Sequence, residues 1–206
     1  MRATGTRVRL TYPEGFTGIY SGELALQGTA EQSRLSGEVR LVRGVYSKDI
    51  ELTSLLGFGS REYAGTDAEL LPENVFLEVG LVSHGNVWMR NKLVQVEARL
   101  DLHVGGELVQ PELTGRIELF EDGKLTFRDV DYRILRGSLE FMDLERINPY
   151  LELTAETDVE EYNITLHLEG TLDDFEYPLT SAPSLSEQDI ISLLLTGQTL
   201  TELGKS

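Results

Sequence analysis

The chain has 206 residues, of which 40% are apolar and 26% charged, a composition typical of a globular protein. Its 35 acidic and 18 basic residues give a net charge of −17, which repels nucleic acid and argues against docking on anionic lipid headgroups. The absence of cysteine excludes disulfides, thiolate metal ligands and a cysteine nucleophile, without fixing the cellular compartment.

The N-terminal residues carry no targeting signal. The segment MRATGTRVRLTYPEG lacks the apolar centre of a signal peptide. No apolar run in the sequence approaches the length of a membrane-spanning helix. We therefore expect either a cytosolic protein or a fragment whose targeting segment lies outside this sequence.

Two alternating segments open the chain. In each, apolar side chains occupy every second position, the period of a β-strand with one apolar face. They are Val8, Leu10 and Tyr12 in the first segment, and Leu35, Val39 and Leu41 in the second. Residues 44–75 are rich in Gly, Ser and Asp without a sustained period, which predicts an irregular, mobile loop with a helical turn around Leu52–Leu56.

The clearest strand follows in LVQVEARLDLHVGGEL. Its polar positions carry Gln, Glu, Arg, Asp and His, and the pair Gly105-Gly106 is expected to end it. Its apolar positions are Val94, Val96, Ala98, Leu100, Leu102 and Val104.

The next segment, GRIELFEDGKLTFRDVDYRIL, predicts a hairpin around Glu121-Asp122-Gly123, a favourable tight-turn sequence between two alternating runs. The apolar phase changes near Arg128-Asp129, which predicts a β-bulge or a break there. A further strand follows, with Leu139 and Phe141 on its apolar side.

Two more amphipathic strands complete the set. NPYLELTAET begins after an Asn-Pro turn, and YNITLHLEGTL repeats the same alternation. Their apolar positions include Leu151 and Leu153 in the first strand, and Ile164, Leu166 and Leu168 in the second.

A single helix is predicted over residues 184–197. Ser186 is a suitable N-cap, with Asp189 three residues later and Glu187 in the first turn. Gly197 fits the position that ends a helix. A helix of this length cannot cover a large sheet.

These segments predict an all-β domain of about ten to twelve strands, in which neighbours in sequence pair antiparallel as a meander. The apolar face of such a sheet must be buried. A closed sandwich, a barrel, or an open trough occupied by apolar ligands would each achieve this. The long strands and the aliphatic lining favour the trough, because flexible acyl chains require no directed hydrogen bonds.

The residues offer little support for catalysis. His84, His103 and His167 lie far apart in the sequence, and no pair has the spacing of a metal site. The acidic pairs lie next to turns and strand ends, and no serine occupies a nucleophile elbow. We expect a protein that is not an enzyme and that holds neither metal nor cofactor.

Four motifs resemble, in the same order, those of the C-terminal conserved domain of TamB-family proteins. The resemblance extends from about residue 5 to residue 197, and the last two motifs are the most specific. The motifs are Arg43-Gly44-Val45-Tyr46, Gly137-Ser138-Leu139-Glu140-Phe141, Asn148-Pro149-Tyr150-Leu151, and the tail from Ser181-Ala182-Pro183 to Gly197.

The resemblance implies a single domain over residues 1–206, with long antiparallel strands curled into a U-shaped β-taco and one C-terminal helix. TamB-like proteins are AsmA-like, are anchored in the inner membrane by an N-terminal helix, and span the periplasm of diderm bacteria. Because the anchor and the long repetitive body are missing here, we expect a periplasmic domain of a longer protein or a short homologue.

The resemblance further implies that the groove carries phospholipid toward the outer membrane. The expected lining is the apolar set above, from Val94 to Leu168. An alternative role is assembly of outer-membrane β-barrel proteins, in which a sheet edge pairs with a client strand beside a TamA- or BamA-type barrel partner. A third possibility is a self-contained β-sandwich without a groove.

Overall fold

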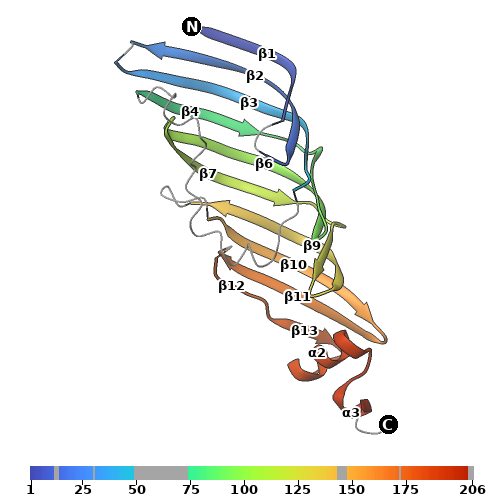
Figure 1. Cartoon of the computed structure of the whole chain (residues 1–206). Coiled ribbons are helices and arrows are strands. Elements are labelled where there is room, and N and C mark those ends of the chain that lie inside the picture. Colours follow the sequence, from blue (N-terminus) through green and yellow to red (C-terminus); the bar gives the residue numbers. More distant parts are fainter. Residues whose placement is uncertain (12–13, 30, 49–73, 143–147, 172, 204–206) are drawn as a thin grey trace.

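The structure, a computed structural model, describes all residues except 12–13, 30, 49–73, 143–147, 172 and 204–206. The described part forms one large sheet followed by a short helical tail (Figure 1). The predicted all-β fold with a C-terminal helix is therefore confirmed. One continuous sheet takes the place of the two stacked sheets of a sandwich.

The sheet has thirteen strands, ten of which follow the order β1-β2-β3-β4-β6-β7-β9-β10-β11-β12. The other three, β5, β8 and β13, lie in line with β4, β7 and β12, because each pair shares a neighbouring strand. The bounds are β1 Arg2–Leu10, β2 Phe16–Gly28, β3 Ser33–Tyr46, β4 Val75–Val82, β5 Val87–Arg90, β6 Val94–Glu107, β7 Gln110–Leu119, β8 Lys124–Phe127, β9 Val130–Phe141, β10 Tyr150–Val159, β11 Tyr162–Thr171, β12 Phe175–Glu176 and β13 Leu179–Ala182.

The expected meander of antiparallel neighbours is wrong in part, because β4 and β5, β7 and β8, and β12 and β13 follow each other in sequence without pairing. β3 pairs in parallel with both β4 and β5, whereas all other described pairs are antiparallel. A parallel neighbour requires a long connection, and residues 47–74 provide it. Of the predicted 44–75 loop, Gly44 to Tyr46 belong to β3 and Val75 begins β4, while residues 49–73 lie outside the described residues.

The predicted hairpin around Glu121-Asp122-Gly123 is also wrong. β7 pairs with β9 rather than with β8, so this turn joins two strands that do not pair. The hairpin is instead β8–β9, closed by Arg128 and Asp129 with φ angles of 50° and 63°. Positive φ at both central residues is the conformation of a type I′ turn. The phase change near Arg128 is thus a chain reversal, not a bulge.

β6 is longer than its alternation indicates. Gly105-Gly106 does not end the strand, because the two glycines pair with Glu112 and Pro111 of β7. The strand reaches Glu107, where the turn to β7 begins.

The sheet bends along a line that crosses all its strands. The long strands β3, β6 and β9 pass through this line, but β4 and β7 stop there and β5 and β8 begin beyond it. Bulges continue the line through β1–β2, β2–β3 and β9–β10, with the last between Thr154 and Ala155. Such irregularities increase bending and twist. The two halves of each long strand therefore become two walls of a curved sheet.

The tail carries the predicted helix, α2 (Glu187–Thr196), and a further turn, α3 (Leu200–Leu203). The Ser186 hydroxyl accepts from the Asp189 N–H, and Gly197 ends the helix with φ of 75°. Ile190 and Leu193 pack against Ile164 of β11, so the helix covers one end of the sheet.

Candidate functional site

The predicted lining positions all lie on one face of the sheet. Strand register decides this, because residues directly opposite each other in adjacent strands point to the same side. One row runs from Leu100 through Ile117 and Leu139 to Leu151. The predicted strand faces therefore join into a single apolar face.

A second row shows how far this face extends. It crosses nine strands, from β1 to β11, and contains only apolar residues and glycine: Leu10, Gly18, Gly44, Val87, Ala98, Leu119, Gly137, Leu153 and Leu168. The glycines make room for large neighbours. A Cβ at Gly44 would lie 2.4 Å from Cζ of Phe16, and one at Gly137 would lie 2.9 Å from Cδ1 of Leu119. The Phe16 and Leu119 side chains thus cover Gly44 and Gly137, and the face stays apolar there.

The opposite face is built from ionic ladders. Arg99 pairs with Glu118, and Arg133 bridges Asp122 and Glu156. Further cross-strand pairs join Arg2 to Glu23 at 2.7 Å and Arg34 to Glu78 at 2.9 Å. These groups are exposed, so each pair contributes little to stability. They show which face of the sheet is directed to water.

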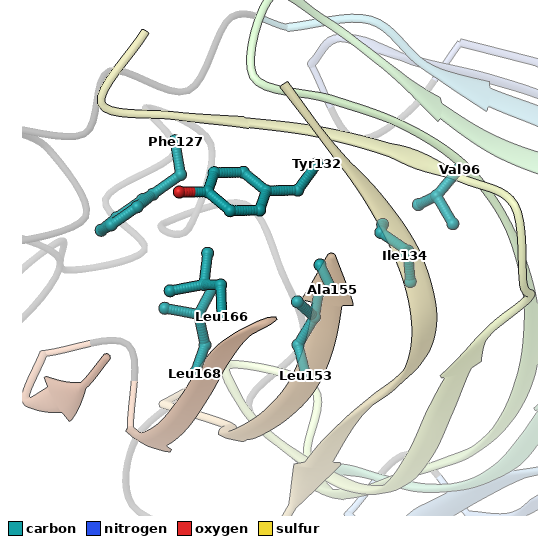
Figure 2. Close-up of a cluster of buried hydrophobic side chains, with 8 residues drawn as sticks. All are labelled: Val96, Phe127, Tyr132, Ile134, Leu153, Ala155, Leu166 and Leu168. Carbon is teal, nitrogen blue, oxygen red and sulfur yellow. The ribbon is translucent and has the colours of Figure 1, made fainter. Parts of the chain in front are cut away.

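Burial on the apolar face changes along the sheet. Toward the C-terminal strands the face is a filled core, in which side chains from β6, β8 and β9 meet those from β10 and β11 (Figure 2). Ile134, Ala155 and Leu166 are completely buried there. The cluster comprises Val96, Phe127, Tyr132, Ile134, Leu153, Ala155, Leu166 and Leu168.

In the middle of the sheet the face is only partly covered. Leu41, Val87, Leu100 and Leu102 form a second buried cluster near the bend. The hydrophobic side chains packed against them remain partly exposed: Phe16, Tyr20, Leu81, Leu113, Ile117 and Phe141.

At the N-terminal strands the same face is open in the described part of the chain. Leu10 is 49% exposed, Val8 44% and Leu26 38%. These residues occupy rows that continue directly into the partly covered middle of the sheet. The apolar face thus passes from an open end at β1 to a closed end at β11.

The structure divides the predicted lining set between these regions. Val96, Leu153, Leu166 and Leu168 belong to the filled core, and Ile164 packs under α2. Val94 and Leu151 pack against the filled core. The remaining positions lie in or beside the partly covered middle: Ala98, Leu100, Leu102, Val104, Leu139 and Phe141.

Several residues of this face were not found from the sequence. Ile117 and Leu113 alternate within β7 and could have been added from their spacing. Leu81 was hidden because β4 reads VFLEVGLV, in which Phe76 and Val82 are apolar although they oppose Glu107 and Asp101. A nearly continuous apolar run gives no period from which the face can be assigned.

The apolar face carries no ionised group at neutral pH in the rows described above. Burial raises the pKa of Tyr20 and of Tyr132, so both phenols stay protonated. Elsewhere among the described residues, no three His, Cys, Asp or Glu side chains gather to hold a metal ion. None of the helices in this part of the chain has the length and apolarity needed to cross a bilayer. What the arrangement offers chemically is apolar surface.

Comparison with known families places the chain in a family. The model of the TamB C-terminal domain family matches residues 1–206, the whole chain. A search among curated proteins finds no match.

Proposed function

Because the chain belongs to the TamB C-terminal domain family, we propose that its apolar face shields or conducts the acyl chains of phospholipids between the inner and outer membranes. The domain acts in the periplasm as part of an inner-membrane-anchored protein, without catalysis or cofactor. The observation that carries this proposal is the uninterrupted apolar face that stays open at β1 and β2.

The energetics suit a transient occupant. Each buried methylene contributes about 0.8 kcal/mol, so ten methylenes contribute about 8 kcal/mol. Association costs of about 4–15 kcal/mol offset much or all of this gain. Binding is then weak enough to release, as conduction requires. Because the face offers no fixed charge, it discriminates little between headgroups.

Two adjacent residues of β7 allow a matched test. Leu113 pairs with Val104 on the apolar face, while Thr114 pairs with His103 on the polar face, and both are half-buried. Leu113→Arg places a charge on the proposed path, whereas Thr114→Arg places the same charge on the wet side. Binding is measured with a phospholipid that carries a fluorophore on its acyl chain.

We expect Leu113→Arg to lower the affinity at least about tenfold, equal to roughly 1.4 kcal/mol. Thr114→Arg should bind like the unmodified chain. Equal binding by all three proteins, with circular dichroism showing each to be folded, would contradict the proposal.

A second function, assembly of outer-membrane barrel proteins, is favoured by a different observation. β1 is an edge strand of the sheet, and its residues are exposed along almost its whole length. An exposed strand edge offers main-chain groups to a client strand. Photocrosslinkers at Thr4 of β1 and at Leu81 of the apolar face distinguish the two roles. Crosslinks to a barrel protein from Thr4 alone would favour assembly over lipid conduction.

A further inference from the structure

The closed end of the sheet is held by a contact between residues that are distant along the sheet. Phe127 ends β8, and Tyr177 lies between β12 and β13 beyond β11. Four strand-to-strand steps separate these positions, or about 19 Å at roughly 4.8 Å per step. Their ring centroids are nevertheless 5.4 Å apart. The sheet must therefore curl until the tip of the β8–β9 hairpin meets the edge of the sheet beyond β11.

The contact includes polar and cationic components as well as aromatic ones. Arg128 donates a hydrogen bond to the Tyr177 hydroxyl at 2.7 Å, and its Cζ lies 4.7 Å from the centre of that ring. The Phe175 and Tyr177 rings lie 6.3 Å apart. We name the contact of Phe127 and Arg128 with Phe175 and Tyr177 the aromatic clasp.

The β8–β9 hairpin that presents Phe127 is braced from the polar side. Asp131 accepts a hydrogen bond from Thr126 at 2.7 Å and pairs with Lys124 at 2.7 Å. The type I′ turn at Arg128 and Asp129 also fixes the direction of the two strands. The hairpin is thus positioned as one unit against the edge of the sheet beyond β11.

The space beneath the aromatic clasp is occupied by protein. Tyr132 is 3% exposed, and Leu166 and Ile134 are fully buried. The rings of Phe127 and Tyr132 lie over Leu166 and Leu168 in this cluster (Figure 2). An acyl chain could enter this region only by displacing these side chains.

The part of the face that is open or only partly covered has a suitable length for one acyl chain. From β1 to β7 the path makes five steps, about 24 Å at roughly 4.8 Å each. One leaflet of a bilayer is about 15 Å thick, half of a hydrocarbon core of about 30 Å. A chain lying across the strands therefore fits between the open end and the aromatic clasp.

We propose that the aromatic clasp is a stopper, so that a phospholipid acyl chain occupies the apolar face of β1 to β7 and ends at Phe127. This inference rests on the proposed function and adds the extent of the binding site. Lipid then reaches this site over the open N-terminal strands, and its acyl chain does not pass beneath the aromatic clasp.

Photolabelling tests the proposal on the complete 206-residue chain. The probe is phosphatidylethanolamine with a diazirine at the end of one acyl chain, presented in phosphatidylethanolamine–phosphatidylglycerol vesicles. Labelled peptides are located by mass spectrometry. We expect labels at Ile117, Leu119 or Phe127, where the acyl chain ends, and none at Leu166 or Leu168. Labels at Leu166 in the unmodified chain would overturn the stopper while supporting lipid binding.

A variant with the clasp removed gives the converse test. Tyr177 is 40% exposed, so the double variant Arg128→Ser, Tyr177→Ala should fold, as checked by circular dichroism and thermal unfolding. We expect its labels to extend to Leu166 and Leu168. An unchanged pattern would overturn the role of the aromatic clasp. Tyr150→Ala is the matched control, because Tyr150 bonds Glu169 on the polar face.

A measurement without lipid separates failure of the stopper from failure of lipid binding. Since the chain has no cysteine, spin labels can be placed cleanly at Asp129 and Glu176. We expect a short, narrow distance distribution in the unmodified chain and a broader one in the double variant. A broad distribution in the unmodified chain would overturn closure of this end. A narrow one with no photolabel in either protein would overturn acyl binding, and the stopper with it.

Discussion

Phe127 and Tyr177 pack ring to ring, 5.4 Å apart, although four strand-to-strand steps separate them in the same sheet. This contact separates two regions of a single apolar face. On its C-terminal side the face is a packed core that stabilises the fold. On its N-terminal side the face is only partly covered, and this is the side to which we assign lipid binding.

The two regions should respond differently to truncation. Leu166→Ala removes buried methyl groups from the packed core and should lower the free energy of unfolding by about 2–5 kcal/mol. Leu10→Ala truncates a side chain of the same type that is 49% exposed, so its effect should stay within about 0.5 kcal/mol. Urea unfolding measures both. Similar losses in the two variants would refute the division of the face.

The cap of α2 should contribute to stability because this helix covers Ile164. Ser186→Ala removes the hydroxyl that accepts from the Asp189 N–H at 3.2 Å. We expect a loss of about 0.5–2 kcal/mol in unfolding free energy. Ser184→Ala, at an exposed position before the cap, serves as the control. A loss no greater than that of the control would show that the cap is unimportant.

Two glycines of the central strands should differ in their tolerance of a methyl group. Gly115 has φ of 112°, and a Cβ there would lie 2.3 Å from the Asp101 carbonyl oxygen. Gly115→Ala should therefore cost about 1–3 kcal/mol through backbone strain. Gly80 has no contact closer than 3.8 Å at the same point, so Gly80→Ala should be nearly neutral. The melting temperatures of the two variants are compared with that of the unmodified chain. Equal melting temperatures for Gly115→Ala and Gly80→Ala would be evidence against this strand geometry.

The β8–β9 hairpin should make the free energy of unfolding depend on pH. Hydrogen bonds from Lys124 and Thr126 hold the pKa of Asp131 below its usual value. A lowered folded-state pKa gives stability that is present above the unfolded value of about 3.9 and is lost as pH falls through the folded-state pKa. Asp131→Asn should thus be less stable than the unmodified chain at pH 7, and the gap should close on acidification.

Thermal unfolding between about pH 7 and pH 2 measures this difference in stability between the unmodified chain and Asp131→Asn. Thr126→Val removes one of the two hydrogen bonds to Asp131 and should make the stability difference smaller. A gap that stays constant over the whole range would rule out the ionisation of Asp131 as its cause.

The sequence predicted those features that depend on local periodicity and capping. Alternation placed Leu100, Leu151 and Leu166 on one face because a β-strand has a fixed period of two residues. Ser186 and Gly197 located the helix because both ends are defined by specific side-chain and backbone chemistry.

Features that depend on the path of the chain were missed. The parallel pairing of β3 with β4 is not encoded in either strand alone. The composition of Glu121-Asp122-Gly123 favours a tight turn and predicts the hairpin there. The hairpin turn is instead Arg128-Asp129, which adopts positive φ without glycine. The meeting of Phe127 and Tyr177 depends on curvature accumulated over four strands, which no residue pattern reports.

The central claim, that the apolar face holds phospholipid, is tested most directly by native mass spectrometry of the chain purified from the periplasm of a diderm bacterium, followed by lipid extraction. We predict a population whose mass exceeds that of the protein by one phospholipid, and recovery of that lipid in the extract. A single population at the mass of the protein alone, with no extractable phospholipid, would contradict the claim.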